Sequence, residues 1–163
     1  IFPGLSVLEN VLVPLTLRDG EGMGFLRAHH RAPERVDEAR GILERVGLAA
    51  EAGRRASELP YGDKRRIEIA LVLALRPKLV LLDEPTAGMT PEETEQMVGL
   101  IRQLAEESSV TFFLTEHDMK VVFSVADYIY VLHQGSLLAE GAPGEIRTDP
   151  RVREAYLGGS LDS

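Results

Sequence analysis

Two adjacent carboxylates, Asp83 and Glu84, follow the apolar run "KLVLL" and are the residues best placed for chemistry. Open α/β sheets place their ligand sites at the carboxyl ends of such strands. There, one carboxylate can hold Mg²⁺ while the other orients or deprotonates an attacking water. Pro85 is expected to bias Glu84 toward an extended backbone. The alternative is a turn before a helix with two solvated acids. Two adjacent charged side chains are unexpected at the end of a buried strand unless they have a function, so we favour the functional interpretation.

The elements around this pair alternate between strand and helix patterns. The continuous apolar run at 78–83 predicts a strand buried on both faces of a parallel sheet. Thr90, Pro91 and Glu93 predict a helix that begins with a capping box. Its predicted buried stripe is Met97, Leu100, Ile101 and Leu104. A second buried strand at 110–115 precedes a helix at 118–126, a strand at 128–132, a turn at 133–136 and a strand at 137–141. The pattern therefore predicts an α/β fold for this half of the chain.

The segments before residue 78 and after residue 141 are predicted to be mainly helical. Ser6 and Glu9 have the spacing of a capping box before the first apolar helix. A Gly-rich break at 19–25 precedes a second helix, which we expect to end at Gly47. A third helix is predicted from about Asp63 to Leu75, and the tail at 142–157 suggests two short helices.

Composition excludes some functions. The formal net charge of −8 argues against a nucleic-acid surface, which needs clustered Lys and Arg. The absence of cysteine removes disulfides, thiolate metal sites and Cys nucleophiles. No apolar run approaches the roughly 20 residues that cross a bilayer, and we expect no signal peptide in the opening segment, which lacks a basic start. We expect a soluble, cytoplasmic protein.

Three motifs in order resemble those of ABC-type ATPases. "LVLLDEPTAG" resembles the Walker B segment and the D-loop, "LPYGDKRRIEIALVLALRPKLV" the signature motif and its helix, and "FFLTEHDM" the switch-histidine segment. The resemblance extends to ATP-binding subunits of branched-chain amino acid transporters, through "FPGLSVLENV", "LPYG", "AGM" and "EAYLG".

The resemblance implies roles for the acidic pair and for one histidine. Asp83 corresponds to the Mg²⁺-associated Walker B acid, Glu84 to the catalytic base and His117 to the histidine that contacts the γ-phosphate. The implied cofactors are ATP and Mg²⁺. A lone histidine after a strand is usually solvated or hydrogen-bonded within the structure. For His117, the flanking "FFLT" and "DM" residues favour the functional interpretation instead. His29 and His30 match no motif and are read as solvated.

The signature and D-loop residues are implied to face the nucleotide of a partner subunit. The signature residues are Leu59, Pro60, Tyr61, Gly62 and Asp63, and the D-loop residues are Gly88, Met89 and Thr90. The commonest signature is LSGGQ, so Pro60 replaces its serine, Tyr61 its first glycine and Asp63 its glutamine. The serine hydroxyl is then unavailable, which leaves the backbone N–H groups near Gly62 as the anion site. Thr90 stands where many members carry Asp or Asn.

The resemblance also implies the fold and the partners. The fold would be the C-terminal portion of a P-loop NTPase of the ABC type with a helical subdomain. We expect a helical, partner-facing part at 1–76, an α/β core at 77–141 and a helical tail at 142–163. The partners would be a second ATP-binding subunit, identical or paralogous, and integral-membrane permease subunits at the cytoplasmic face of the inner or plasma membrane.

The sequence contains no G-x-x-x-x-G-K-[ST] phosphate-binding motif. It therefore resembles a subunit that lacks its N-terminal, Walker A portion, and we expect the segment alone to be inactive and unstable. Two alternatives stay open. One is an ATPase of another ABC system, such as lipid or lipopolysaccharide export. The other is a non-catalytic assembly module with the same fold.

Overall fold

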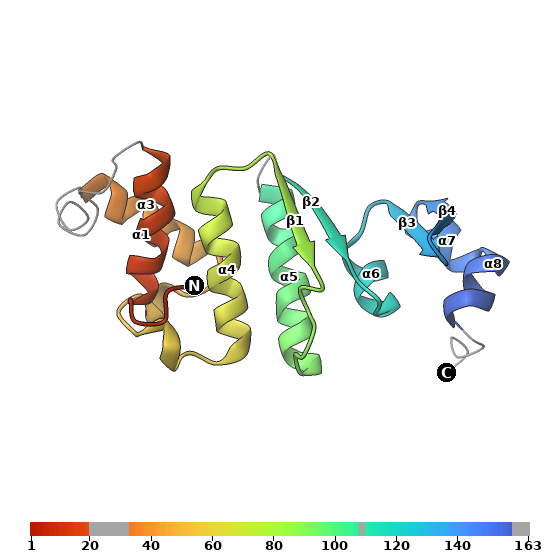
Figure 1. The fold of residues 1–163 in the computed structure, drawn as a ribbon, viewed down its shortest axis with the longest axis horizontal. Helices are drawn as coiled ribbons and strands as arrows, with labels where there is room; N and C mark the ends of the chain where they lie inside the picture. Colours follow the sequence, from red (N-terminus) through yellow and green to blue (C-terminus); the bar gives the residue numbers. More distant parts are fainter. Residues whose placement is uncertain (20–32, 108–109, 158–163) are drawn as a thin grey trace. The chain divides into compact units, whose positions relative to one another are not determined.

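The computed structural model describes residues 1–19, 33–107 and 110–157. The chain divides into two compact units, Ile1–Thr115 and Glu116–Ser163 (Figure 1). Most of the predicted Gly-rich break, together with His29 and His30, lies outside the described residues. The division into parts at 1–76, 77–141 and 142–163 stays a prediction.

Three helices form the N-terminal part of the first unit. They are α1 (Val7–Arg18), α3 (Pro33–Arg45) and α4 (Tyr61–Ala74), and α1 contacts both of the others (Figure 1). Two short 3₁₀ turns, Ala49–Glu51 and Ala56–Glu58, lie between α3 and α4. The predicted capping box of α1 is confirmed, because the Glu9 N–H donates to the Ser6 hydroxyl and the Ser6 N–H to the Glu9 carboxylate. Gly47 has φ +73°, as expected of a residue that ends a helix.

A buried amide fixes the N-terminal turn against α1. Asn10 is fully buried, and its Oδ1 accepts a hydrogen bond from the Phe2 N–H at 2.8 Å. Its Nδ2 donates to the carbonyls of Phe2 and Ser6 at 3.0 and 2.9 Å. Because a buried amide is costly unless it is paired, these bonds explain how a polar residue is accommodated between Phe2 and the helix.

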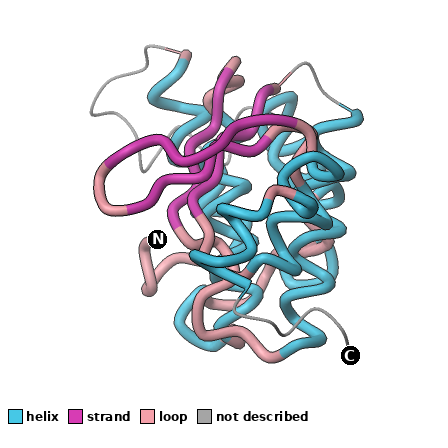
Figure 2. The backbone as a smooth tube through the Cα atoms, turned by 90° about the vertical axis from the view of Figure 1, so that its right-hand side faces the viewer, coloured by secondary structure: helices cyan, strands magenta, loops and turns pink. Residues whose placement is uncertain are grey.

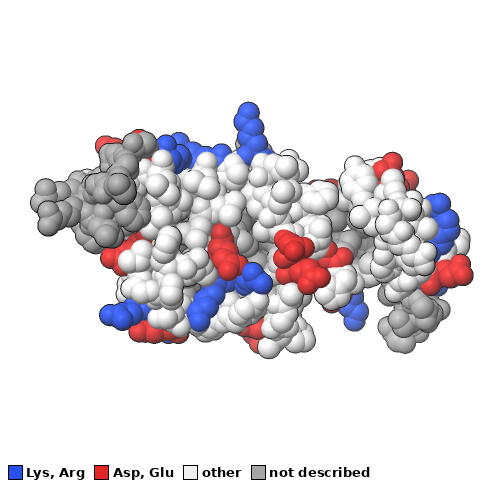
Figure 3. Space-filling view, viewed as in Figure 1, with Lys and Arg blue, Asp and Glu red and all other residues white. Residues whose placement is uncertain are grey.

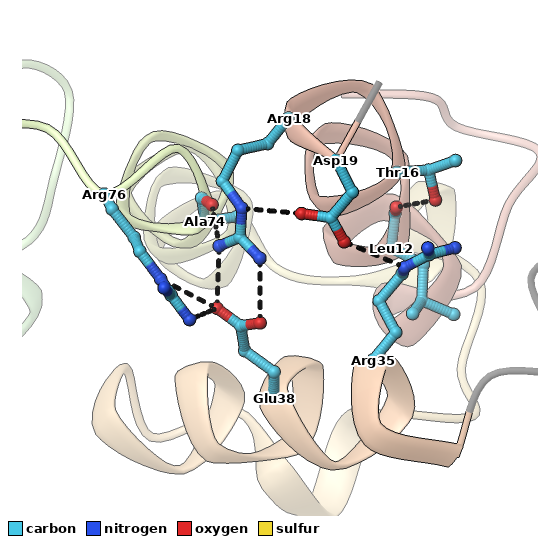
Figure 4. Close-up of polar contacts among 8 residues, drawn as sticks. All are labelled: Leu12, Thr16, Arg18, Asp19, Arg35, Glu38, Ala74 and Arg76. Atoms are coloured by element: carbon cyan, nitrogen blue, oxygen red, sulfur yellow. Dashed lines mark hydrogen bonds and ion pairs between the residues drawn. The ribbon is translucent and has the colours of Figure 1, made fainter. Parts of the chain in front are cut away.

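A charge network joins the last residues of α1 and α4 to the second turn of α3 (Figure 4). The Arg18 guanidinium donates to both oxygens of Glu38, at 2.7 and 2.9 Å, and to the carbonyl of Ala74 at 3.0 Å. Arg76, just beyond α4, donates to the same carboxylate at 2.9 Å. The hydrogen bonds from Arg18, and secondarily those from Arg76, lower the pKa of Glu38 to about 2.

The first unit also contains a two-stranded parallel sheet. Strand β1 (Leu79–Asp83) pairs with β2 (Thr111–Thr115), and the register places Asp83 opposite Thr115. Helix α5 (Pro91–Glu107) connects the strands and contacts both β2 and α4. The predicted buried stripe of α5 is confirmed at Met97, Leu100, Ile101 and Leu104.

The expectation that these strands are buried on both faces is wrong for the described chain. Val80 is 2% exposed, whereas Leu79, Leu81 and Phe113 on the opposite face are 53%, 70% and 50% exposed. A parallel sheet is buried on both faces only where other elements cover both. Within the described part of the first unit, nothing covers the face that carries Leu81.

Helix α4 begins two residues earlier than predicted, at Tyr61 rather than Asp63. Pro60 is its N-cap residue and makes no side-chain capping bond. The residues Tyr61 and Gly62 therefore belong to the first helical turn, so the backbone N–H groups of the signature segment lie at the helix start.

The second unit is built around a β-hairpin. After α6 (Met119–Val125), the strands β3 (Ile129–His133) and β4 (Ser136–Gly141) pair in antiparallel fashion through a tight loop (Figure 2). Gln134 and Gly135 have φ +48° and +77°, which matches a type I′ turn. The tail forms α7 (Pro143–Thr148), α8 (Pro150–Val152) and a π-helical turn at Arg153–Leu157. The core of this unit contains Ile129, Val131, Ala139, Ile146 and Val152. Among all described residues, no helix has the length and apolar character needed to cross a membrane.

Candidate functional site

Asp83 and Glu84 lie at the carboxyl end of β1, as the sequence predicts. Both side chains are exposed, and acidic side chains gather over this end of the strand on the surface (Figure 3). The Thr115 hydroxyl, from the neighbouring end of β2, donates a hydrogen bond to Asp83 Oδ1. The orientation of the Asp83 carboxylate is therefore set by a residue 32 positions away in the sequence.

The backbone of Glu84 is not extended, so that expectation is wrong. Glu84 has φ +44°, in the left-handed region that residues other than glycine seldom adopt. Its N–H donates to the Thr115 carbonyl at 3.0 Å, and its carbonyl accepts from the Ala87 N–H at 3.1 Å. The residue thus ends the strand pairing and begins a turn at once, and these two bonds outweigh the preference imposed by Pro85. Strained conformations of this kind cluster at functional sites.

Two consecutive turns lead from β1 to α5. Pro85 occupies the second position of the first turn, where its fixed φ is favourable. In the second turn, the Met89 N–H donates to the Thr86 carbonyl at 3.2 Å, and Gly88 has φ +76°. A type II turn requires a positive φ at this third position, so glycine is the natural residue. Pro85 and Thr86 are buried, so the segment just before the D-loop packs into the interior of the first unit.

The first turn of α5 begins with the predicted capping box. The Glu93 N–H donates to the Thr90 hydroxyl at 3.3 Å, and the Thr90 N–H donates to Glu93 Oε2 at 2.9 Å. The hydrogen bonds from the Thr90 backbone and then its side chain lower the pKa of Glu93, and the Gly62 N–H lowers it further. Thr90 therefore serves as a helix cap, and its position at a partner interface stays a prediction.

The structure brings the signature segment and the D-loop together. Gly62 is buried, and a Cβ atom placed on it would lie 3.1 Å from Glu93 Oε1. Residues from the starts of α4 and α5 together line a cavity of about 210 Å³. Its lining residues are Pro60, Gly62, Asp63, Arg66, Met89, Glu93, Gln96 and Met97.

The remaining signature residues differ in exposure and contacts. Leu59 is buried, whereas Tyr61 is 47% exposed and lies 3.9 Å from the place of a Cβ on Gly88. The Arg65 guanidinium stacks over the Tyr61 ring at 5.3 Å and donates to its hydroxyl at 3.1 Å. The Asp63 carboxylate lies 3.8 Å from Arg66, so its negative charge is partly compensated within α4.

His117 belongs to the second unit, whereas Asp83 and Glu84 belong to the first. It is exposed in the bend between β2 and α6. The next residue, Asp118, caps α6 by accepting a hydrogen bond from the Lys120 N–H at 2.8 Å. A joint site of His117 with the acidic pair stays a prediction.

Asp83 suits a magnesium ion that is bound together with a substrate. Within the described ranges, no three His, Asp or Glu side chains group as metal ligands. Magnesium is often held by only one or two carboxylates, with phosphate oxygens and waters as the other ligands. An exposed carboxylate whose orientation is fixed by the Thr115 hydroxyl fits that role.

Sequence reasoning missed two residues of this site. Thr115 was identified only as part of a strand, and its bond to Asp83 depends on strand register. Glu93 was identified only as a capping residue, although its carboxylate also reaches α4. The cap spacing was a signal for Glu93, but no local pattern links it to Gly62.

Known families and proteins match most of this chain. Residues 1–87 match the family described as "ABC transporter", and residues 136–162 match "Branched-chain amino acid ATP-binding cassette transporter". The high-affinity branched-chain amino acid transport ATP-binding protein LivG of Salmonella typhimurium is 45% identical, over 97% of this chain and 64% of the relative. BraF of Pseudomonas aeruginosa, which carries the same description, is 42% identical over the same shares.

Solved structures agree with the sequence comparisons. The ADP conformation of MJ1267, an ATP-binding cassette of an ABC transporter, matches with a TM-score of 0.78 and 29% identity, over 96% of this chain and 64% of that one. The fold is therefore that of an ABC ATPase cassette, and the chain spans just under two thirds of the length of these relatives. The chain belongs to the ABC transporter family, among the ATP-binding proteins of the branched-chain amino acid type.

Proposed function

We propose that this chain is part of an ATP-binding subunit that couples MgATP hydrolysis to the import of branched-chain amino acids. The observation that supports it most is the strained turn at the end of β1, which presents Asp83 and Glu84 side by side at the surface. The relatives named LivG and BraF support the cargo. The partners would be a second ATP-binding subunit and membrane permease subunits, at the cytoplasmic face of the membrane.

Each predicted residue has a task in this proposal. Asp83 would hold Mg²⁺, which neutralises phosphate charge when it is bound. Glu84 would accept a proton from water while the water oxygen bonds to the γ-phosphorus and ADP leaves. His117 would donate a hydrogen bond to the γ-phosphate.

The signature and D-loop segments would act on the partner's nucleotide. The signature residues at 59–63 would present the first N–H groups of α4 to its phosphates, where the helix dipole favours an anion. Gly88, Met89 and Thr90 would lie at the interface between the subunits. Their closeness to the start of α4 supports a common surface made of both segments.

A transport assay tests the cargo. We define the fused subunit as the N-terminal part of Salmonella typhimurium LivG, up to the start of the alignment, joined to Ile1 of this chain. Expressed in a strain that lacks LivG, it should restore uptake of labelled leucine. A fused subunit that co-purifies with the permease without restoring uptake would contradict the proposal.

The 163 residues alone should bind nucleotide very weakly, because they contain no Walker A motif. Loss of about four charge-assisted hydrogen bonds, at roughly 1.5 kcal/mol each, lowers affinity by about four orders of magnitude. Calorimetry of the segment should show no MgATP binding at micromolar concentrations, whereas the fused subunit should bind. Micromolar binding by the segment alone would show that this estimate is wrong.

A further inference from the structure

The carboxylate of Glu93 contacts both segments that are expected to face the partner subunit. Its Oε2 accepts the Thr90 N–H of the D-loop at 2.9 Å. Its Oε1 lies against the first turn of α4, 3.1 Å from the place of a Cβ on Gly62. The two oxygens are therefore used separately, one for each segment.

The absence of a side chain at Gly62 permits this approach. Any larger residue there would place its Cβ closer to Glu93 Oε1 than is usual for such contacts. Glu93 also lines the cavity between α4 and α5 together with Pro60 and Met89. The Gly62 N–H is one of the groups that lower the pKa of Glu93, so the carboxylate is the form that spans the two segments.

We propose that Glu93 is a positioning residue for ATP hydrolysis, which keeps the D-loop and the signature helix at a fixed spacing. The proposal rests on the proposed function, since both segments would have to meet one nucleotide held by the partner. An error of about 1 Å in such an arrangement can lower the rate about a hundredfold. A residue that sets the spacing therefore affects turnover more than it affects nucleotide binding within its own subunit.

Two substitutions separate this role from helix capping. Glutamine is an accepted third residue of a capping box, so Glu93→Gln should leave the start of α5 intact. Its amide replaces one of the two carboxylate oxygens with an NH₂ donor, however, so only one of the two segments keeps an acceptor at its place. Glu93→Ala removes both contacts. Glu92→Gln is the matched control, because Glu92 is an exposed glutamate of the same first turn.

The experiment measures three quantities on the fused subunit, purified with the transporter in which it assembles. They are turnover at saturating MgATP, the Kd for MgADP and the thermal midpoint. We expect Glu93→Gln to lower turnover about tenfold, with the other two quantities unchanged. Glu93→Ala should lower turnover at least as much and also lower the midpoint. Glu92→Gln should match the unaltered subunit in all three.

Two results would overturn the proposal. One is a Glu93→Gln subunit that hydrolyses ATP at the unaltered rate. The other is a loss of turnover in the Glu93→Gln subunit that is accompanied by weaker MgADP binding or a lower midpoint, since it would indicate a structural role. If the unaltered fused subunit assembled but did not hydrolyse ATP, the proposed function itself would fail, and the role of Glu93 with it.

Discussion

The hydroxyl of Thr115 donates a hydrogen bond to Asp83 Oδ1 across the carboxyl ends of two parallel strands. The register that pairs Asp83 with Thr115 makes this bond possible, and it fixes one oxygen of the acid assigned to Mg²⁺. A carboxylate held in this way loses less conformational freedom when it binds a metal.

Thr115→Val should therefore weaken the apparent affinity of the fused subunit for Mg²⁺. Valine keeps the shape of threonine and removes the donor, so the Mg²⁺ concentration for half-maximal ATPase activity should rise about fivefold. Thr111→Val, at the opposite end of the same strand, is the control and should leave it unchanged. Equal values for the two variants would contradict the role given to Thr115.

The strained backbone at Glu84 predicts that glycine is more stabilising than alanine there, which is the reverse of their usual order in a helix. At φ +44°, glycine avoids a penalty of about 1 kcal/mol that alanine incurs, so Glu84→Gly should be more stable than Glu84→Ala. At Glu95, an exposed position within α5, alanine should be more stable than glycine by about 1 kcal/mol. Urea denaturation of the four variants of the fused subunit measures both differences. The same order at both sites would argue against a left-handed Glu84.

Glu38 should make the stability of the helical part depend on pH. Its pKa is lowered from 4.5 to about 2, so the carboxylate stabilises the folded state above pH 4.5. That contribution should be lost as the pH falls from 4.5 toward 2. Glu38→Gln should cost about 1–2 kcal/mol at pH 6 after solvent screening, and much less at pH 2.5.

Glu44→Gln is the control for this prediction, because Glu44 is an exposed glutamate on the same helix. Urea denaturation curves of the fused subunit and of its two variants, recorded at a series of pH values, give the free energies of unfolding. A difference between Glu38→Gln and the unaltered protein that stays constant from pH 6 to pH 2.5 would contradict the assigned network.

Local sequence patterns predicted the features that depend on neighbouring residues. The capping boxes at Ser6 and Thr90, the stop at Gly47 and the stripe of α5 all follow from short-range hydrogen bonding and helical periodicity. The alternation of strand and helix predicted a parallel sheet, and β1 does lie in one, although its pairing with β2 was not predicted.

Features that depend on contacts between distant segments could not be predicted in this way. The positive φ of Glu84 arises from a bond to Thr115 that only the sheet register creates. The approach of Glu93 to Gly62 requires α4 and α5 to be packed together. Burial of β1 was overestimated because an apolar run does not reveal which elements of the described chain cover it.

The most direct test of the central assignment is Glu84→Gln in the assembled fused subunit. Glutamine keeps the size of the side chain but cannot accept a proton from water at neutral pH. We predict that MgATP binding, measured by calorimetry, stays within about threefold of the unaltered value, while ATP turnover falls at least a hundredfold. Turnover that remained at the unaltered rate would show that Glu84 is not the catalytic base.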